Sequence, residues 1–294
     1  MSKKTQVILL GTGTPNADPK RSGPAVAVIV GQQAYLVDFG PGVVRQAAKA
    51  YELGIEALAP SNLKYAFCTH LHSDHTLGYA DLIFSPWVLG REESLKIWGP
   101  KGLKNMTDHL HAAYGRDIQE RREGKEPANP NGWQVEVTEI QAGVIYRDEE
   151  QGLIVEAFPV SHGSFVSFGY KFTAPDRTIV ISGDTAPTDE LIRQAKDCDL
   201  LVHEAYYAAG WETRNPEWKA YHASVHTSTL ELGKIANAVK PKQLVLYHQL
   251  FMMDHQSEPT RVQDRVLVIE KEMIKEVESI YAGEVLSGQD MGIY

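Results

Sequence analysis

The sequence predicts a layered α/β fold in a single domain that spans residues 1–294, with two central sheets covered by helices. Three observations lead to this prediction. Short apolar runs alternate with helical patterns and turn residues along the chain. The length and the hydrophobic share of 43% are sufficient for a substantial core. We find no internal repeat and no low-complexity segment that would indicate a different architecture.

The predicted elements begin with a β-meander, because the apolar runs 6–10, 25–30 and 34–39 are separated by glycine-containing turns. Further strands are expected at 63–70, 95–100, 152–162, 168–173, 178–184, 199–205 and 243–248. Helices are expected after Asp74, over 188–196, and from the capping box of Ser228 and Glu231 to Pro241. A last helix carries one apolar stripe, formed by Val266, Ile269, Met273, Val277 and Ile280.

Charge and cysteine content restrict the functional classes. The formal net charge of -9 includes no large basic field, and nucleic-acid binding draws on lysines and arginines that neutralise phosphates. We therefore expect a small-molecule substrate and no nucleic-acid partner. Cys68 and Cys198 lie in or beside apolar runs, which predicts buried thiols and excludes a disulfide framework. The run 6–10 is too short for a signal peptide or a membrane span, so we expect a cytoplasmic protein without membrane contact.

The segment 69–75, Thr-His-Leu-His-Ser-Asp-His, follows one of the predicted strands and carries four potential metal ligands. Imidazoles and carboxylates are ligands that zinc binds at about 2.0–2.2 Å. His70 and His72, as alternate residues of an extended chain, project to the same side, and Asp74 and His75 could turn toward a second ion. A solvated polar turn is the competing interpretation, but three histidines at this spacing make it the weaker one.

Three further ligand candidates follow other predicted strands: His162, Asp184 and His248. Each alone could be a capped or turn residue. In open α/β sheets, however, ligands collect at the carboxyl ends of the strands. Seven ligands are too many for one tetrahedral ion, and they suit two ions with one bridging carboxylate.

These motifs resemble the metallo-β-lactamase superfamily, through the H-x-H-x-D-H pattern at 70–75 and the order of His162, Asp184 and His248. The resemblance implies a four-layer αββα sandwich and a dinuclear hydrolase. It implies a first metal site of His70, His72 and His162 and a second of Asp74, His75 and His248, with Asp184 as the bridge. Zinc is the expected identity of the two divalent ions, and manganese and iron are the alternatives.

Within that superfamily the sequence is most similar to the ribonuclease Z and arylsulfatase-like branch. The segment His203-Glu204-Ala205 resembles the branch's His-Glu-Ala-Thr motif, and the segment His226-Thr227-Ser228-Thr229 resembles its His-Ser-Thr motif. By that likeness His226, oriented by Glu204, would assist the leaving group, although Glu204 could equally be a structural partner of a nearby histidine. Ribonuclease Z proteins carry an arm that grips transfer RNA between the ligands that correspond to His162 and Asp184. Only 21 residues separate the two here, which leaves no room for an arm.

The expected mechanism uses a hydroxide that bridges the two ions, with Asp74 accepting a proton from the attacking water and His226 assisting the leaving group. The expected substrate is a small phosphodiester, sulfate ester, carboxylic ester or lactone, with a β-lactam as a further candidate. Aromatic residues crowd the segment 206–221 and could either line the pocket or pack the loop onto the core. Asp38 could orient a ligand imidazole or simply stabilise a turn.

Several alternatives remain at this point. An iron-dependent oxidoreductase of the same fold would use the same ligand types. A ribonuclease Z-like RNA endonuclease without the arm, and a metal-free binding protein that keeps the fold, are the others. Surface helices with apolar residues could also pair two subunits in a homodimer.

Overall fold

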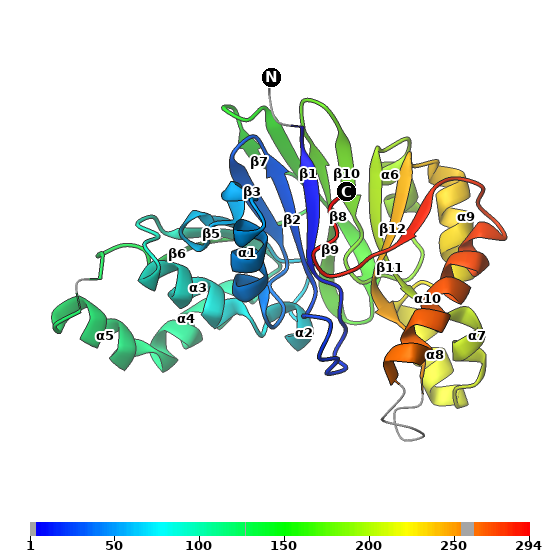
Figure 1. The fold of residues 1–294 in the computed structure, drawn as a ribbon, viewed down its shortest axis with the longest axis horizontal. Helices are drawn as coiled ribbons and strands as arrows, with labels where there is room; N and C mark the ends of the chain where they lie inside the picture. The colour runs from blue at the N-terminus through cyan, green and yellow to red at the C-terminus, as the bar shows by residue number, and fades with distance from the viewer. Residues whose placement is uncertain (1–3, 127, 254–261) are drawn as a thin grey trace. The chain divides into compact units, whose positions relative to one another are not determined.

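The computed structural model describes residues 4–126, 128–253 and 262–294. The chain forms two compact units (Figure 1). The first comprises residues 1–141, 147–153 and 289–294, and the second comprises residues 142–146 and 154–288. Each unit is built around one sheet with helices packed on it, which confirms the prediction of a layered α/β protein with two sheets.

The sheet of the first unit has six strands in the order β1-β2-β3-β4-β5-β6. Its strands are β1 (Gln6–Gly11), β2 (Ala25–Val30), β3 (Gln33–Val37), β4 (Tyr65–Phe67), β5 (Leu95–Gly99) and β6 (Val135–Glu139). The first three form the predicted antiparallel meander, and β3 to β6 are parallel. Because Val37 pairs with Phe67, the segments that follow β3 and β4 leave the sheet side by side.

Helices cover one face of this sheet (Figure 1). The helical segments are α1 (Val43–Glu52), η1 (Glu56–Leu58), η2 (Pro60–Asn62), α2 (Ser73–Thr76), α3 (Tyr79–Val88), α4 (Leu103–Ala113) and α5 (Gly115–Glu123). Val43 and Ala47 of α1 and Leu82 of α3 pack in one core cluster with Ile8 and Leu36 of the strands. The alternation of strand side chains directs one set of apolar residues to the helices.

The second sheet has seven strands in the order β13-β12-β11-β10-β9-β8-β7. They are β7 (Gly143–Asp148), β8 (Leu153–His162), β9 (Phe165–Thr173), β10 (Thr178–Ile181), β11 (Leu200–Tyr206), β12 (Gln243–Leu250) and β13 (Val285–Ser287). Strands β10 to β13 are parallel, whereas β9 is antiparallel to both β8 and β10. Strand β8 therefore runs in the same direction as β10, and the carboxyl ends of β8, β10, β11 and β12 lie at one edge.

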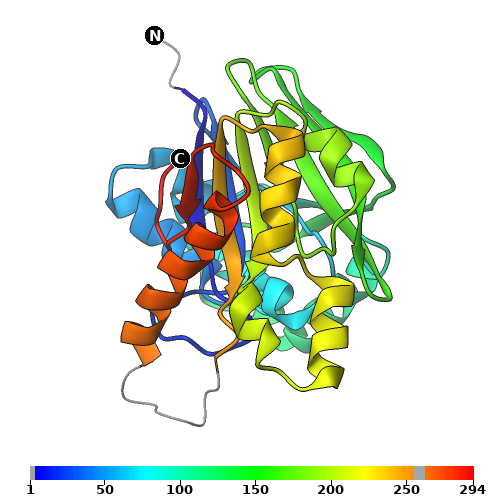
Figure 2. The same ribbon diagram turned by 90° about the vertical axis from the view of Figure 1, so that its right-hand side faces the viewer.

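Among the residues of the second unit that the structure describes, the helices are α6 (Asp189–Ala195), α7 (Ala208–Glu212), α8 (Pro216–Val225), α9 (Thr229–Val239) and α10 (Val262–Glu278). Helices α9 and α10 lie along the sheet (Figure 2) and bury Leu232 and Met273 against its strands. The Ser228 side chain accepts a hydrogen bond from the Glu231 amide, so the predicted cap begins α9. The predicted apolar stripe is on α10, except for Ile280, which lies beyond the end of that helix.

The interval between His162 and Asp184, which the sequence predicts to be too short for an arm, consists of strands and turns in the structure. Strands β8 and β9 are joined by a tight turn at Gly163, whose φ of 61° is left-handed, and β10 follows after a short turn. The residues between His162 and Asp184 are therefore almost entirely the antiparallel strands β9 and β10 and their turns. Both cysteines are buried thiols, as predicted. Among the described residues, no helix is both long enough and apolar enough to cross a membrane.

Candidate metal centre

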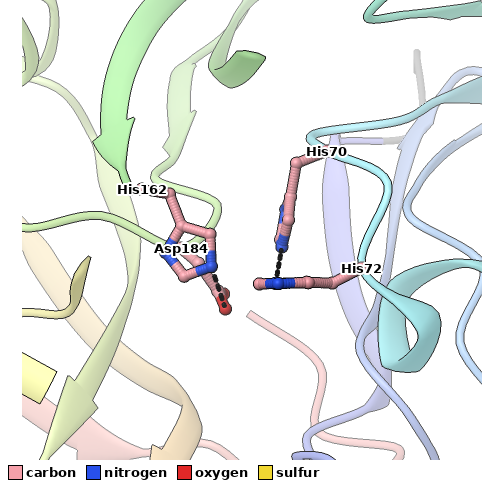
Figure 3. Close-up of side chains that lie close together, drawn as sticks. All are labelled: His70, His72, His162 and Asp184. Carbon is pink, nitrogen blue, oxygen red and sulfur yellow. Dashed lines mark hydrogen bonds and ion pairs between the residues drawn. The ribbon is translucent and has the colours of Figure 1, made fainter. Parts of the chain in front are cut away.

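The first group of predicted ligands follows the carboxyl end of β4, an interior strand of the first unit's sheet. The chain leaves β4 through Cys68 and Thr69, and His72 then caps the short helix α2. His70 and His75 are completely buried, and Asp74 is 7% exposed. His70 Nε2 and His72 Nδ1 are 3.0 Å apart and point toward one another, as Figure 3 shows. His75 Nε2 lies 3.6 Å from an Asp74 carboxylate oxygen.

Asp38 orients two of these imidazoles. It follows β3 and has a left-handed φ of 60°, a conformation that aspartate tolerates better than most residues. Its carboxylate accepts hydrogen bonds from the Thr69 amide at 2.8 Å, from the Thr69 hydroxyl and from His75 Nδ1 at 2.8 Å. A proton on Nδ1 of His75 leaves the Nε2 lone pair to bind a cation.

The Thr69 hydroxyl extends this orientation to His70. Since its hydrogen is directed to Asp38, its oxygen can accept from His70 Nδ1, which lies 2.9 Å away. His70 therefore also presents an unprotonated Nε2. One buried carboxylate thus fixes the tautomers of two predicted ligands, the arrangement in which histidine usually binds metal. Asp38 bonds both a backbone amide and an imidazole. It therefore stabilises the local backbone and also orients a ligand imidazole, the two roles that the sequence left open.

The second group of predicted ligands lies at the common edge of the second unit's strands. His162 ends β8, and Asp184 follows β10 after Ser182 and Gly183. His162 Nδ1 donates to the Val225 carbonyl at 2.8 Å, which leaves Nε2 unprotonated, and Nε2 lies 3.9 Å from an Asp184 carboxylate oxygen (Figure 3). Burial lowers the pKa of His162, although the Asp184 charge opposes the shift, so the ring is held in the neutral form that binds metal.

His248 reaches this edge through a β-bulge. In the pairing of β11 with β12, Tyr247 is opposite Glu204 and Gln249 is opposite Ala205, so His248 is an extra residue with a left-handed φ of 43°. Bulges redirect a side chain out of the ordinary alternation. Here the redirected His248 Nε2 lies 3.7 Å from the same Asp184 oxygen that faces His162.

Glu204 is a completely buried carboxylate in β11. Its Oε1 atom accepts three hydrogen bonds, from His226 Nδ1 at 3.0 Å and from the Thr185 and Thr227 amides at 3.1 Å each. A carboxylate bonded to Nδ1 fixes the ring and leaves Nε2 of His226 as the chemically available nitrogen. His226 Nδ1 is 4.0 Å from an Asp184 oxygen, so the pair lies next to the predicted bridging ligand.

The donors in each unit fit a divalent metal ion. Two ligands bound at about 2.1 Å to one tetrahedral ion are roughly 3.4 Å apart. The separations of 3.6 Å for His75 and Asp74, 3.7 Å for His248 and Asp184, and 3.9 Å for His162 and Asp184 are near this value and too long for ordinary hydrogen bonds. Buried neutral imidazoles beside carboxylates are the donor set expected for zinc, manganese or iron.

Some supporting residues were not singled out from the sequence. Thr185 and Thr227 hold the Glu204 carboxylate, and the Thr227 hydroxyl also donates to the Thr185 carbonyl. The Val225 carbonyl fixes His162. Thr227 lies within the motif-like segment that begins at His226, but no pattern in the sequence marks Thr185 or Val225, whose backbone groups do most of the bonding. Thr69 was visible only as a neighbour of His70.

Comparison with known proteins defines the class. The Beta-lactamase superfamily domain model matches residues 33–249, and the solved metallo-β-lactamase fold protein YhfI from Bacillus subtilis superposes with a TM-score of 0.73 at 17% identity, covering 99% of both chains. The structure of the short form of human tRNase Z superposes with a TM-score of 0.67 at 22% identity, covering 98% of both chains. The protein is a metal-dependent hydrolase with this fold, as the sequence predicted, and the fold implies divalent metal ions.

The comparison of sequences narrows the class further. A protein named Ribonuclease Z from Mycobacterium bovis (strain BCG / Pasteur 1173P2) is 31% identical over 249 residues, which cover 83% of this chain and 85% of the relative. The chain therefore belongs to the metallo-β-lactamase superfamily and to its ribonuclease Z branch.

One prediction is wrong in the light of these relatives: the expectation of a small-molecule substrate and no nucleic-acid partner. Relatives across most of the chain are named for RNA cleavage, against that expectation. The physical reason is that a net charge of -9 is a sum over the whole surface. It does not describe the field at one site, where bound cations are often the largest local charges.

Proposed function

We propose that the protein is an endoribonuclease of the ribonuclease Z type, which hydrolyses a phosphodiester bond of RNA. The observation that carries the proposal is the 31% identity to a protein named Ribonuclease Z over 83% of the chain. The buried donors and the Glu204–His226 pair supply the chemistry that such a reaction needs. A small ester, favoured from the sequence alone, has less support.

In this proposal the chain holds two divalent ions, and zinc is the preferred metal. His70, His72 and His162 with Asp184 would form one donor set, and Asp74, His75 and His248 the other. Asp184 would serve both ions, since one of its oxygens already faces both His162 and His248. When bound, the ions would supply a water of lowered pKa and stabilise negative charge on the phosphate.

The local charge favours a phosphodiester. Five of the seven proposed ligands are histidines that contribute no charge when neutral, and two are carboxylates. Two divalent cations would exceed the charge of these two ligand carboxylates and make the immediate surroundings of the ions positive, although the Asp38 and Glu204 carboxylates behind the imidazoles would offset part of this charge. This positive centre would attract RNA although the whole chain is acidic.

The chain's own residues would then move the protons. Asp74, buried beside His75, would accept the proton that the attacking water loses. His226 would donate a proton from Nε2 to the leaving oxygen, while Glu204 holds Nδ1 and stabilises the positive charge of the protonated ring. The separation of the two roles between two residues lets attack and departure be assisted at once.

RNA would have to be held without the arm, because the antiparallel strands β9 and β10 occupy the interval between His162 and Asp184. The proposed activity is therefore RNA cleavage whose substrate contacts come from elsewhere on the chain.

We also propose that the two units act together as one domain. The cytoplasmic location and the homodimer stay predictions.

The test is a comparison of substrates with the zinc-loaded full chain: a precursor transfer RNA with a 3′ extension, a DNA of the same sequence, and chromogenic phosphodiester, sulfate ester, carboxylic ester, lactone and β-lactam substrates. Asp184→Ala should lose the activity, and Asp189→Ala, an exposed residue in the first turn of α6, should keep it. Cleavage of RNA in preference to every other substrate supports the proposal. Turnover of a small ester without RNA cleavage contradicts it. Iron bound in the purified protein, together with no hydrolysis of any substrate, also contradicts it and would favour the iron-dependent oxidoreductase.

A further inference from the structure

Helix α8 exposes large aromatic side chains. Trp218 is 53% exposed and Tyr221 is 44% exposed, and together with Glu217 they line a hollow of about 410 Å³. The two rings meet edge to face, with centroids 5.7 Å apart. Neither belongs to the core cluster of the second unit, so packing of the loop onto the core does not account for them.

The exposed rings are connected to the candidate centre by a series of ring contacts. Trp218, His222 and His226 are four residues apart on and just beyond α8, a spacing that places side chains above one another. Ring planes are 27° apart between Trp218 and His222, with centroids at 5.4 Å, and 32° apart between His222 and His226, at 6.1 Å. The last step, from His226 to His248, has a centroid distance of 6.0 Å and an angle of 22°.

The helix that carries the rings is held in a fixed position. The Asn215 side chain caps it by accepting from the Trp218 amide, and Pro216 occupies its first turn. The Trp211 indole donates to the Lys219 carbonyl at 3.0 Å, while the Lys219 ammonium lies 4.9 Å over the same indole. His222 Nδ1 donates to the Trp218 carbonyl at 2.8 Å, which fixes that ring as well. Such rings can bind a flat ligand with little loss of conformational freedom.

The chemistry of the hollow selects the part of RNA that would occupy it. A phosphate would be repelled by the Glu217 carboxylate, whereas a base offers a π-face to the aromatic rings. A base with an exocyclic amino group can also donate a hydrogen bond to a carboxylate. Unpaired bases stack on exposed aromatic side chains in this way in single-stranded RNA recognition.

We infer that Trp218 and Tyr221 form a stacking site for one unpaired base of the RNA, a short distance along the strand from the phosphodiester that is cleaved. The inference rests on the proposed function and names a substrate contact that replaces part of the missing arm's role. The series of rings from Trp218 to His226 sets the direction in which the strand leaves the centre.

The test scans an RNA substrate with single abasic ribonucleotides through the unpaired positions on both sides of the cleaved bond, using the metal-loaded full chain. For the wild type, one abasic position should raise the Kd by roughly fivefold to 150-fold, the range that base–aromatic stacking implies. Trp218→Ala should raise the Kd of the intact RNA by a similar factor and abolish the penalty at that position. Trp218→Phe should keep part of both effects.

The matched control is Tyr51→Ala, because Tyr51 is an equally exposed aromatic residue on α1 at 47%. It should change neither the Kd nor the abasic penalties. If Trp218→Ala leaves the penalty in place while the wild type cleaves RNA, the inference is wrong and the proposed function stands. If the wild type cleaves no RNA and instead turns over a small aromatic ester with a KM that Trp218→Ala raises, both fail and the hollow binds that ester.

Discussion

Replacement of Glu204 by glutamine is the sharpest probe of the proposed proton donor. Glutamine has the shape of glutamate and keeps a carbonyl oxygen for the Thr185 and Thr227 amides and for His226 Nδ1, which all bond Oε1 now. It removes the negative charge and puts an amide NH2 group in place of the buried Oε2 atom. A neutral amide stabilises a protonated imidazole less than a carboxylate does, so we expect a smaller fraction of His226 to carry the proton that the leaving oxygen needs.

Two effects follow, and the three hydrogen bonds to Oε1 set the size of the second. A general acid contributes about 10²-fold to 10⁴-fold, so kcat for RNA should fall by roughly 100-fold or more in Glu204→Gln. Hydrogen bonds to charged groups contribute about 1.5–3 kcal/mol and neutral ones about 0.5–1.5 kcal/mol, so three weakened bonds should cost about 3 kcal/mol of unfolding free energy. Glu204→Ala would instead leave two buried amides without acceptors, at about 1–3 kcal/mol each, and could unfold the chain.

The assay compares two leaving groups. RNA leaves as an alkoxide that needs a proton, whereas p-nitrophenolate does not, so the loss of kcat should be much smaller with bis(p-nitrophenyl) phosphate. Because Glu204 is expected to act through His226, the double variant with His226→Ala should be no slower than His226→Ala alone. A Glu204→Gln enzyme that cleaves RNA within threefold of the wild type, or that loses equal activity on both substrates, would refute the proton-donor role.

Three further predictions concern residues that support the two units. Asp38→Asn should weaken zinc binding by about 10-fold to 100-fold in a chelator competition, because the carboxylate that orients His75 is lost; unchanged affinity would assign Asp38 to the turn alone. Asp290→Ala should lower the free energy of unfolding in urea by about 2–4 kcal/mol, because Asp290 accepts from the amide and the hydroxyl of the buried Thr12, while Asp290→Asn should lose less. Burial lowers the pKa of His203, so the unfolded chain binds the extra proton first as the pH falls below about 6.5. In chelated protein the unfolding free energy should therefore decrease below that pH by up to about 1.4 kcal/mol per unit, and His203→Asn should reduce the slope.

The sequence predicted the elements with strong periodicity. The meander β1 to β3, the cap at Ser228 and the stripe on α10 all depend on local patterns of apolar and capping residues, which the chain satisfies within a few residues. Weaker patterns were missed. Strands β6 and β7 carry partly exposed, mixed side chains, and α8 lies in a segment where aromatic residues gave no apolar stripe. Their formation depends on pairing and capping partners that are distant in the sequence or not periodic.

The supporting geometry of the candidate site could not be predicted, for a related reason. His248 reaches Asp184 only because β12 inserts one extra residue opposite β11, and the carboxylate of Asp38 reaches Thr69 because β3 and β4 are parallel with Val37 opposite Phe67. Both features are matters of register, which no single strand encodes by itself. The residue types that bind metal can thus be read from the sequence, whereas the hydrogen bonds that select their tautomers depend on pairing between strands. A variant that removes the bulge, by deletion of Gln249, should accordingly keep the sheet while it turns the His248 imidazole away from Asp184.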